Sequence, residues 1–172
     1  FSASPLPCDK GQFAHLQKAL SSHTPIWVFA STHAGEEELA CNIHNKLKKH
    51  FPNILTIVVP RHPHRRDDVV KTCQKAKVPF ALRSASASPK FEKDGVYIVD
   101  TMGELGLFYS LATIAVIGRS FSLDGGGGHN PIEAAQMGCI VLTGPNNQFQ
   151  RPLYDDMAQD KAVIEVPDET AL

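Results

Sequence analysis

The sequence predicts a doubly wound α/β domain, in which a parallel sheet carries helices on both faces. Two observations support this fold class. Short runs of β-branched and aromatic residues alternate along the chain with segments of helical periodicity. The runs are apolar almost throughout, which is typical of parallel strands that are covered on both sides. A chain of 172 residues, 42% of them hydrophobic, suffices for one such domain with a sizeable core.

Six segments have the pattern of buried parallel strands. They are IWVFAS (26–31), ILTIVV (54–59), VYIVD (96–100), TIAVIG (113–118), CIVLTG (139–144) and AVIEV (162–166). A weaker run, FALR (80–83), is consistent with one further strand. The segment 84–95, SASASPKFEKDG, is rich in small and polar residues, so we expect a surface loop there rather than a domain boundary.

Two crossover helices are predicted between the first strands. Residues 36–51 carry an apolar stripe at every fourth position, with acids in the first turn and lysines in the last, as the helix dipole favours. Residues 64–77 repeat this scheme with Val69 and Cys73 on one face. Helices in these places give the right-handed connections that parallel strands require.

The composition of the chain argues against a nucleic-acid partner, disulfide bonds and a membrane-spanning segment. With 17 basic and 18 acidic side chains the net charge is −1, so we expect no nucleic-acid partner. The four cysteines stand far apart without a CxxC motif, and Cys41 and Cys73 fall on apolar helix faces, as reduced thiols do. No run approaches the roughly 18 apolar residues of a membrane span, and the first residues lack the features of a signal peptide. The chain is therefore expected to be soluble.

Unusual residues gather where the predicted strands end. The segments that follow five of the strands are STHAGEE, PRHPHRR, DTMGE, GRSFSLDGGGGHN and TGPNNQ. By contrast, the connections that lead from helices into strands are unremarkable. Open α/β sheets bind ligands outside the carboxyl ends of their strands, so we place the functional site at this edge.

The segment DGGGGHNPIEAA (124–135) predicts an anion site, for which phosphate is the natural candidate. Its glycines lead to Asn130 at an expected N-cap and Pro131 at the first helical position, so free N–H groups would face the loop. A flexible surface turn has the same composition. The motif matches neither the P-loop nor the usual dinucleotide fingerprint.

Two glutamates fit capping boxes, because Glu133 follows Asn130 by three residues and Glu104 follows Thr101 by three. A capping role and a ligand role are both open for them. A carboxylate just inside a phosphate-facing helix also accepts hydrogen bonds from a ribose diol, which offers two donors.

Arg61 ends a buried strand between two prolines and is suited to bidentate anion binding. Arg65 and Arg66 are more typical of a solvated helix start. His62 and His64 lack a third ligand at a recognisable spacing, so we expect no metal and no other cofactor. The sequence contains no GxSxG motif, so it gives no indication of a serine nucleophile.

Four motifs together, ASTHAGEEE, VPRHP, DTMGEL and GGGGHNPIEAA, resemble the carboxyl-terminal half of 3-deoxy-D-manno-octulosonic acid (Kdo) transferases. The resemblance spans residues 1–172 and implies one Rossmann-like half of a GT-B glycosyltransferase. Such enzymes transfer Kdo from CMP-Kdo to a lipid A precursor at the cytoplasmic face of the Gram-negative inner membrane, without a metal. Arg119, Ala34 and Ala134 depart from the family's pattern and put the local loop geometry in question.

The resemblance also implies a donor-binding site. Its residues would be Ser31, Thr32, Arg61, His62, Met102, Gly103, Glu104, Gly127, Gly128, His129, Asn130 and Glu133. Ser31 and Thr32 would line the cleft, the Arg61 segment would meet the cytidine end, and Glu133 would hold the ribose. The glycine loop would approach the phosphate and the sugar acid.

In this family the general base, the membrane-associated segment and most of the acceptor surface belong to an amino-terminal domain, which this chain lacks. We therefore expect the chain to bind the donor but not to turn it over alone. Two alternatives stay open. One is another nucleotide-sugar enzyme of GT-B architecture, such as a sugar-nucleotide epimerase, and the other is a non-catalytic nucleotide-binding or partner-binding domain.

Overall fold

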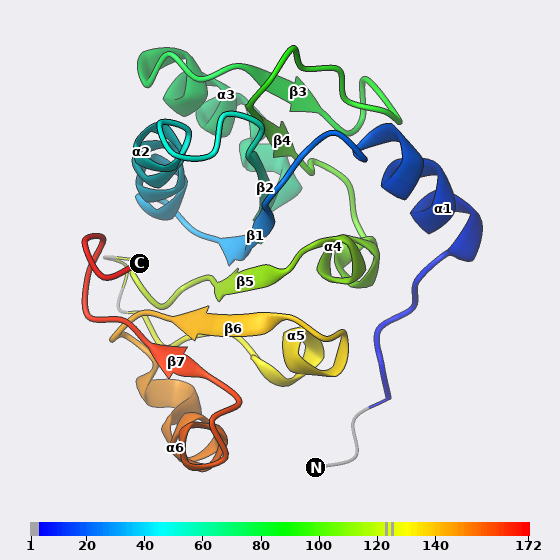
Figure 1. Ribbon diagram of the computed structural model, residues 1–172. Coiled ribbons are helices and arrows are strands. Elements are labelled where there is room, and N and C mark those ends of the chain that lie inside the picture. Colours follow the sequence, from blue (N-terminus) through cyan, green and yellow to red (C-terminus); the bar gives the residue numbers. More distant parts are fainter. Residues whose placement is uncertain (1–3, 123, 125) are drawn as a thin grey trace.

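A computed structural model of the chain describes residues 4–122, 124 and 126–172. The described residues form seven strands: β1 (Ile26–Thr32), β2 (Leu55–Pro60), β3 (Phe80–Leu82), β4 (Gly95–Ile98), β5 (Ile114–Ile117), β6 (Ile140–Thr143) and β7 (Ile164–Glu165). All pair in parallel in the order β3-β4-β2-β1-β5-β6-β7 (Figure 1). The helices are α1 (Lys10–Ala19), α2 (Glu36–Leu47), α3 (Arg66–Lys75), α4 (Leu105–Leu111), α5 (Ile132–Gln136) and α6 (Arg151–Gln159), with short 3-10 turns η1 (Pro63–Arg65) and η2 (Gln148–Gln150). This confirms the doubly wound α/β fold.

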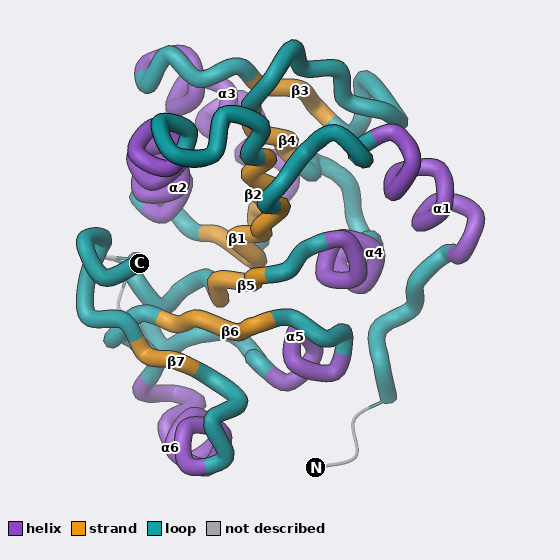
Figure 2. The backbone as a smooth tube through the Cα atoms, viewed as in Figure 1, coloured by secondary structure: helices purple, strands orange, loops and turns teal. Residues whose placement is uncertain are grey.

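The sheet separates two apolar clusters, and Figure 2 shows helices on both sides of the strands. Successive side chains of a strand point to opposite faces, so Val28 and Ala30 of β1 join one cluster while Trp27 and Phe29 join the other. Residues of α1, α4, α5 and α6 belong to the first cluster, and residues of α2 and α3 belong to the second. Both faces of the central strands are thereby removed from water.

The helices differ from the sequence prediction at their ends. The predicted helix 36–51 stops at Leu47 in α2, and the predicted helix 64–77 is divided into η1 and α3 because Pro63 begins a tighter turn. Cys41 and Cys73 face each other between α2 and α3 as buried free thiols, with their sulfur atoms 3.7 Å apart. Their predicted place on the apolar helix faces is confirmed.

The last two strands correct one expectation, because they are not covered on both sides. Ile140 of β6 is 51% exposed and Ile164 of β7 is 52% exposed. β7 is the edge strand of the sheet, and α2 and α3 lie over the other half of this face (Figure 1). Apolar composition alone does not distinguish such an edge from a central strand.

The centre of the sheet positions the site. β1 lies between β2 and β5, so the loops that follow β1 and β5 are neighbours although far apart in sequence. Ser31 forms a bulge at the end of β1 and has a positive φ of 57°. Gly118, at the end of β5, lies so close that a Cβ there would meet the Ser31 carbonyl oxygen at 2.2 Å. The two loops therefore leave the sheet in contact.

None of the helices in the described part of the chain combines the length and the apolar character that crossing a bilayer requires.

Candidate functional site

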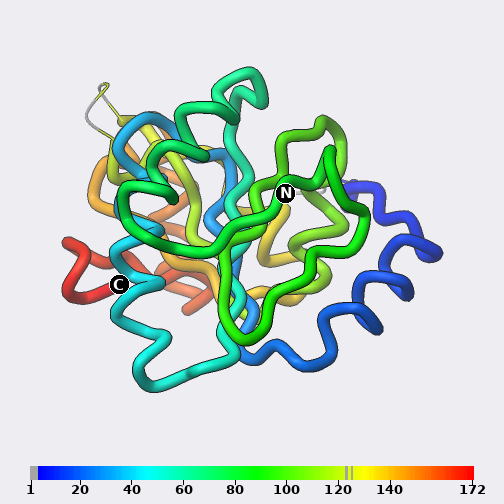
Figure 3. Tube along the Cα trace, turned by 90° about the horizontal axis from the view of Figure 1, so that it is seen from above, coloured from blue at the N-terminus to red at the C-terminus, as the bar shows by residue number. Residues whose placement is uncertain are grey.

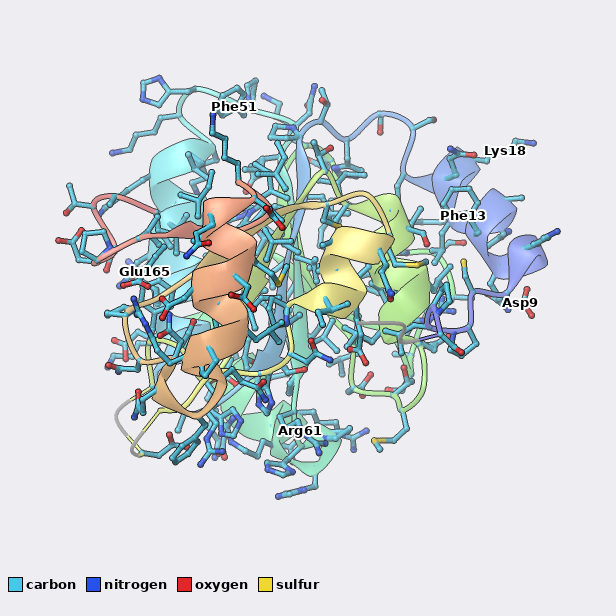
Figure 4. All side chains as sticks on the ribbon, turned by 90° about the horizontal axis from the view of Figure 1, so that it is seen from below. Asp9, Phe13, Lys18, Phe51, Arg61 and Glu165 are labelled. Atoms are coloured by element: carbon cyan, nitrogen blue, oxygen red, sulfur yellow. The ribbon has the colours of Figure 1, made fainter. Side chains whose placement is uncertain are left out.

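The loops with unusual composition converge at one edge of the domain, as the sequence predicted. Figure 3 shows the loops that follow β1, β2 and β5 along the same edge. Figure 4 places Arg61 at this edge, at the opposite end of the domain from Phe51, which lies between α2 and β2. A pocket of about 120 Å³ opens here, and the expected site residues among those that line it are Ser31, Arg61, Met102, Gly103 and Glu104.

The Glu36 carboxylate joins the loops after β1 and β5. It is fully buried and accepts hydrogen bonds from the backbone N–H groups of His33 at 3.0 Å, Arg119 at 2.7 Å and Phe121 at 3.0 Å. Burial raises the pKa of Glu36 to about 7, while the three backbone donors oppose that rise. A single side chain at the start of α2 thus holds two loops in one arrangement.

Glu37, the next residue, corrects two expectations. Thr32 is fully buried and donates its hydroxyl proton to the Glu37 carboxylate at 2.9 Å, so it does not line the cleft. Arg65 binds the same carboxylate through two nitrogens, at 2.8 and 3.3 Å, and is not a solvated helix start. The reason in both cases is that Glu37 is itself buried and requires partners.

Three side chains form a hydrogen-bonded chain across the site. Nδ1 of His33 lies 3.0 Å from Asp124, and its Nε2 lies 2.9 Å from Nε2 of His129. Because burial lowers the pKa of His33, the neutral ring donates from Nδ1 to Asp124 and accepts from His129 at Nε2. Burial, together with the neighbouring His33, Arg61 and Arg119 side chains, lowers the pKa of His129 to about 4. Both rings are therefore neutral at pH 7.

His62 lies with its ring edge-on to His33 at 5.8 Å between centroids. Within residues 4–122, 124 and 126–172, no group of three or more histidine, cysteine, aspartate or glutamate side chains is placed to hold a metal ion.

The glycine loop differs from a simple phosphate cradle. Gly126, Gly127 and Gly128 have φ values of 61°, 113° and 74°, which only glycine adopts readily. The close neighbour of this backbone is protein, because a Cβ on Gly127 would lie 2.0 Å from the Phe149 ring. Gly125 lies outside the described residues.

The N–H groups of this loop are also satisfied internally. That of Gly127 donates to Asn146 at 2.9 Å, that of Gly128 to the carbonyl of Arg119 at 3.1 Å, and that of His129 to Gly118 at 3.2 Å. The N–H groups of Gly127, Gly128 and His129 are therefore not free, and the anion site at the first turn of α5 stays a prediction.

The two expected capping boxes have different outcomes, and neither is complete. Oδ1 of Asn130 accepts from the N–H of Ile132 at 2.9 Å, but α5 begins at Ile132 with Pro131 as its N-cap, so the predicted cap at Asn130 is one residue out. Glu133 does not return the second bond. Its pKa is raised by burial, with no donor to offset that rise. The carboxylate of Glu133 is therefore left without a capping partner.

Glu104 is held by side chains instead of capping α4. Arg83 donates to its two carboxylate oxygens at 3.1 and 2.8 Å, and Thr101 donates at 2.5 Å. The pKa of Glu104 is lowered, chiefly by Arg83. The helix begins at Leu105 with no side-chain bond to its first turn, so the capping prediction for Thr101 and Glu104 is wrong.

The remaining expected residues face solvent. Arg61 and His62 are exposed, although Arg61 was expected to be less solvated than Arg65. Met102 is 73% exposed, and Gly103 has a φ of 77° with open space where a side chain would stand. These residues form an open surface next to the histidine chain.

Sequence reasoning missed the residues that organise the site. Three consecutive acids from Glu36 fit the dipole of any exposed helix start, and Arg83 lies in the weakest of the strand patterns. In the sequence, these residues stand out only as charged residues next to an apolar strand. That pattern is too common to identify a buried charged side chain.

Solved structures show which proteins share this architecture. The chain superimposes on trehalose-6-phosphate synthase OtsA over 98% of its length with a TM-score of 0.57 and 12% identity, a likeness of fold alone. It superimposes on the C-terminal CMP-Kdo binding domain of WaaA from Acinetobacter baumannii with a TM-score of 0.82 and 31% identity, covering 92% of this chain and 82% of that domain. The fold is thus the Rossmann-like half of a GT-B glycosyltransferase.

The relatives found by sequence similarity are named as 3-deoxy-D-manno-octulosonic acid transferases. A protein of Arabidopsis thaliana named as a probable mitochondrial 3-deoxy-D-manno-octulosonic acid transferase is 44% identical over 119 residues, and the Rickettsia felis transferase of that name is 34% identical over 166 residues. The chain belongs to the 3-deoxy-D-manno-octulosonic acid transferase family. It spans 26% and 35% of the lengths of these two relatives. No protein-family model matches the chain.

Proposed function

We propose that this chain binds CMP-Kdo and serves as the donor-binding half of a Kdo transferase. The observation that carries the proposal is the 31% identity to a CMP-Kdo binding domain over 82% of that domain. The position of the site agrees with it, because the converging loops lie at the carboxyl edge where Rossmann-like folds bind nucleotides.

Glu133 has the properties that the ribose contact requires. Its half-buried carboxylate has a pKa raised by burial and accepts no hydrogen bond among the described residues, whereas Glu104 is already bound by Arg83. Two ribose hydroxyls would supply the missing donors. Met102 and Gly103 offer an open surface for the donor, and Arg61 offers an exposed cation.

Titration with CMP tests this function. We expect weak binding, because half of a two-domain cleft leaves much of the ligand exposed. Amide shifts should fall in the segments 60–62, 101–104 and 126–133. Glu133→Gln should weaken binding at least about ten-fold, since a hydrogen bond to a charged group contributes roughly 1.5–3 kcal/mol.

The matched control is Glu38→Gln, an exposed glutamate of α2 that should leave CMP affinity unchanged. Shifts confined to the loops that lead from helices into strands would contradict the proposal. If the parent and Glu133→Gln bind CMP with equal affinity, Glu133 does not hold the ribose.

Catalysis would require a second domain. We propose that the general base and the acceptor surface lie there, that the acceptor is a lipid A precursor, and that the complete enzyme works at the cytoplasmic face of a Gram-negative inner membrane. The relatives' names support the transfer of Kdo. The purified chain should then show no Kdo transfer, and the complete enzyme should fractionate with membranes that contain lipid A precursors.

The alternatives predict different ligands. A sugar-nucleotide epimerase of the same architecture would prefer a different base or sugar over CMP, so competition between CMP and the other nucleoside monophosphates separates the two. A non-catalytic partner-binding domain would show no nucleotide preference at all.

A further inference from the structure

Arg119 has a backbone conformation that an arginine seldom adopts. It follows β5 with a φ of 58°. Three other non-glycine residues have positive φ, but Lys77 and Lys161 lie just past the ends of α3 and α6, where this conformation is common. Arg119 and Ser31 instead lie at the ends of the two central strands. Such strain persists where surrounding contacts impose it, and it gathers at functional sites.

The contacts that impose this conformation are known. Glu36 accepts from the N–H of Arg119 at 2.7 Å, and the N–H of Gly128 donates to its carbonyl at 3.1 Å. The backbone of Arg119 is therefore fixed between α2 and the glycine loop. Its side chain is directed by these two bonds and lies with its guanidinium 5.4 Å from the centroid of the Phe149 ring.

The guanidinium has no anionic partner in the described residues. Its Nε is buried without a hydrogen-bond partner, and it takes part in none of the ion pairs of residues 4–122, 124 and 126–172. Most buried polar atoms are satisfied, so an orphaned Nε is unusual. Arg61 is likewise absent from those ion pairs, and the charges of both arginines act on His129.

No carboxylate of the described residues pairs with either arginine, although Asp124 carries a negative charge beside His33. His33 and His129 are neutral at pH 7, and the N–H groups of the glycine loop already have partners. Asp124 accepts from His33 and Ser122. The edge of the sheet thus holds two unpaired guanidinium groups close to one imidazole, which is an arrangement that an added anion would neutralise.

We propose that Arg119 is a specificity-determining residue that binds an acidic group of the donor, either the nucleotide phosphate or the carboxylate of the sugar acid. The inference rests on the proposed function and adds a contact to the same site. The orphaned Nε and the terminal nitrogens supply the donors, and Phe149 holds the guanidinium plane.

Affinities of Arg119→Gly for cytidine, CMP and CMP-Kdo test the inference. Glycine adopts a φ of 58° without strain, so this variant should be at least as heat-stable as the parent. Lys161→Gly is the matched control, because it removes an exposed cation at the same φ of 58° away from the site. Arg119→Met provides a second variant that removes the charge and keeps the apolar stem.

If Arg119 binds the phosphate, both variants should bind CMP and CMP-Kdo about ten-fold or more weakly and cytidine unchanged. If it binds the carboxylate, only CMP-Kdo affinity should fall. The Lys161→Gly protein should match the parent with every ligand.

Equal affinities of the parent and both Arg119 variants for CMP and CMP-Kdo would overturn the inference and leave the proposed function standing. An equal loss for cytidine would overturn it too, because it would show a change of loop structure. A parent protein that binds none of the three ligands would remove the proposed function itself.

Discussion

The buried carboxylate of Glu36 makes the stability of the fold depend on pH. Its pKa rises from its ordinary value of 4.5 to about 7 on folding, because burial disfavours the charged form. The folded state then binds a proton more tightly than the unfolded state. Its contribution to stability is fully present below pH 4.5 and is lost as the pH rises through 7. At about 1.36 kcal/mol for each pH unit, the loss amounts to roughly 3 kcal/mol.

Glu36→Gln isolates this contribution, since glutamine does not titrate. The free energy of unfolding is measured in urea at pH 4.5, 6, 7 and 8, with the fluorescence of buried Trp27, the single tryptophan, as the probe. Histidines with lowered pKa values, such as His44, act in the opposite direction, so the quantity of interest is the difference between parent and variant.

We expect this difference, parent minus Glu36→Gln, to fall by about 3 kcal/mol between pH 4.5 and 8. Glu38→Gln serves as the control, because an exposed neighbour in the same helix should show no such trend. A difference that is constant, or that increases with pH, would refute the reasoning. It would mean that the three backbone donors outweigh the burial of the charge.

Two further predictions concern the contacts that support the site. Arg83→Met leaves the partly exposed Glu104 carboxylate with Thr101 as its partner, so the free energy of unfolding should fall by about 2 kcal/mol. The double variant Arg83→Met with Glu104→Leu should recover part of this loss in the same urea titration. Tyr154→Phe removes the hydroxyl that donates to the His129 carbonyl at 2.7 Å and should lower the free energy of unfolding by about 1 kcal/mol; an unchanged urea midpoint would show that this bond contributes nothing.

The strands and the place of the site were predictable, because both follow from simple constraints. Apolar runs such as 54–59 must be buried, and the ends of parallel strands must share an edge. The α1 helix was not predicted, since among its residues only Leu16 is buried and its apolar stripe is weak.

The internal chemistry of the site was not predictable from local patterns. Nothing in three consecutive glutamates indicates that Glu36 and Glu37 turn inward while Glu38 stays exposed. In the same way, the sequence of the glycine loop is typical of an anion site. The carbonyls that accept its N–H groups come from residues about ten to twenty positions away, so the sequence pattern does not show them. Such pairings depend on tertiary structure, which spacing alone does not encode.

The contact between the β1 and β5 loops has a consequence for the order of folding. Glu36 meets Arg119 and Phe121 across 83 and 85 residues of chain, so closing this contact is among the entropically more demanding steps. A partly folded chain in which β5 has not yet joined β1 therefore lacks the site, however complete its first four strands are. Only the assembled sheet would bind the ligand, so ligand binding would stabilise the folded state by mass action. During synthesis, the ability to bind the donor would appear late and abruptly, once the chain from β5 through Glu133 has left the ribosome.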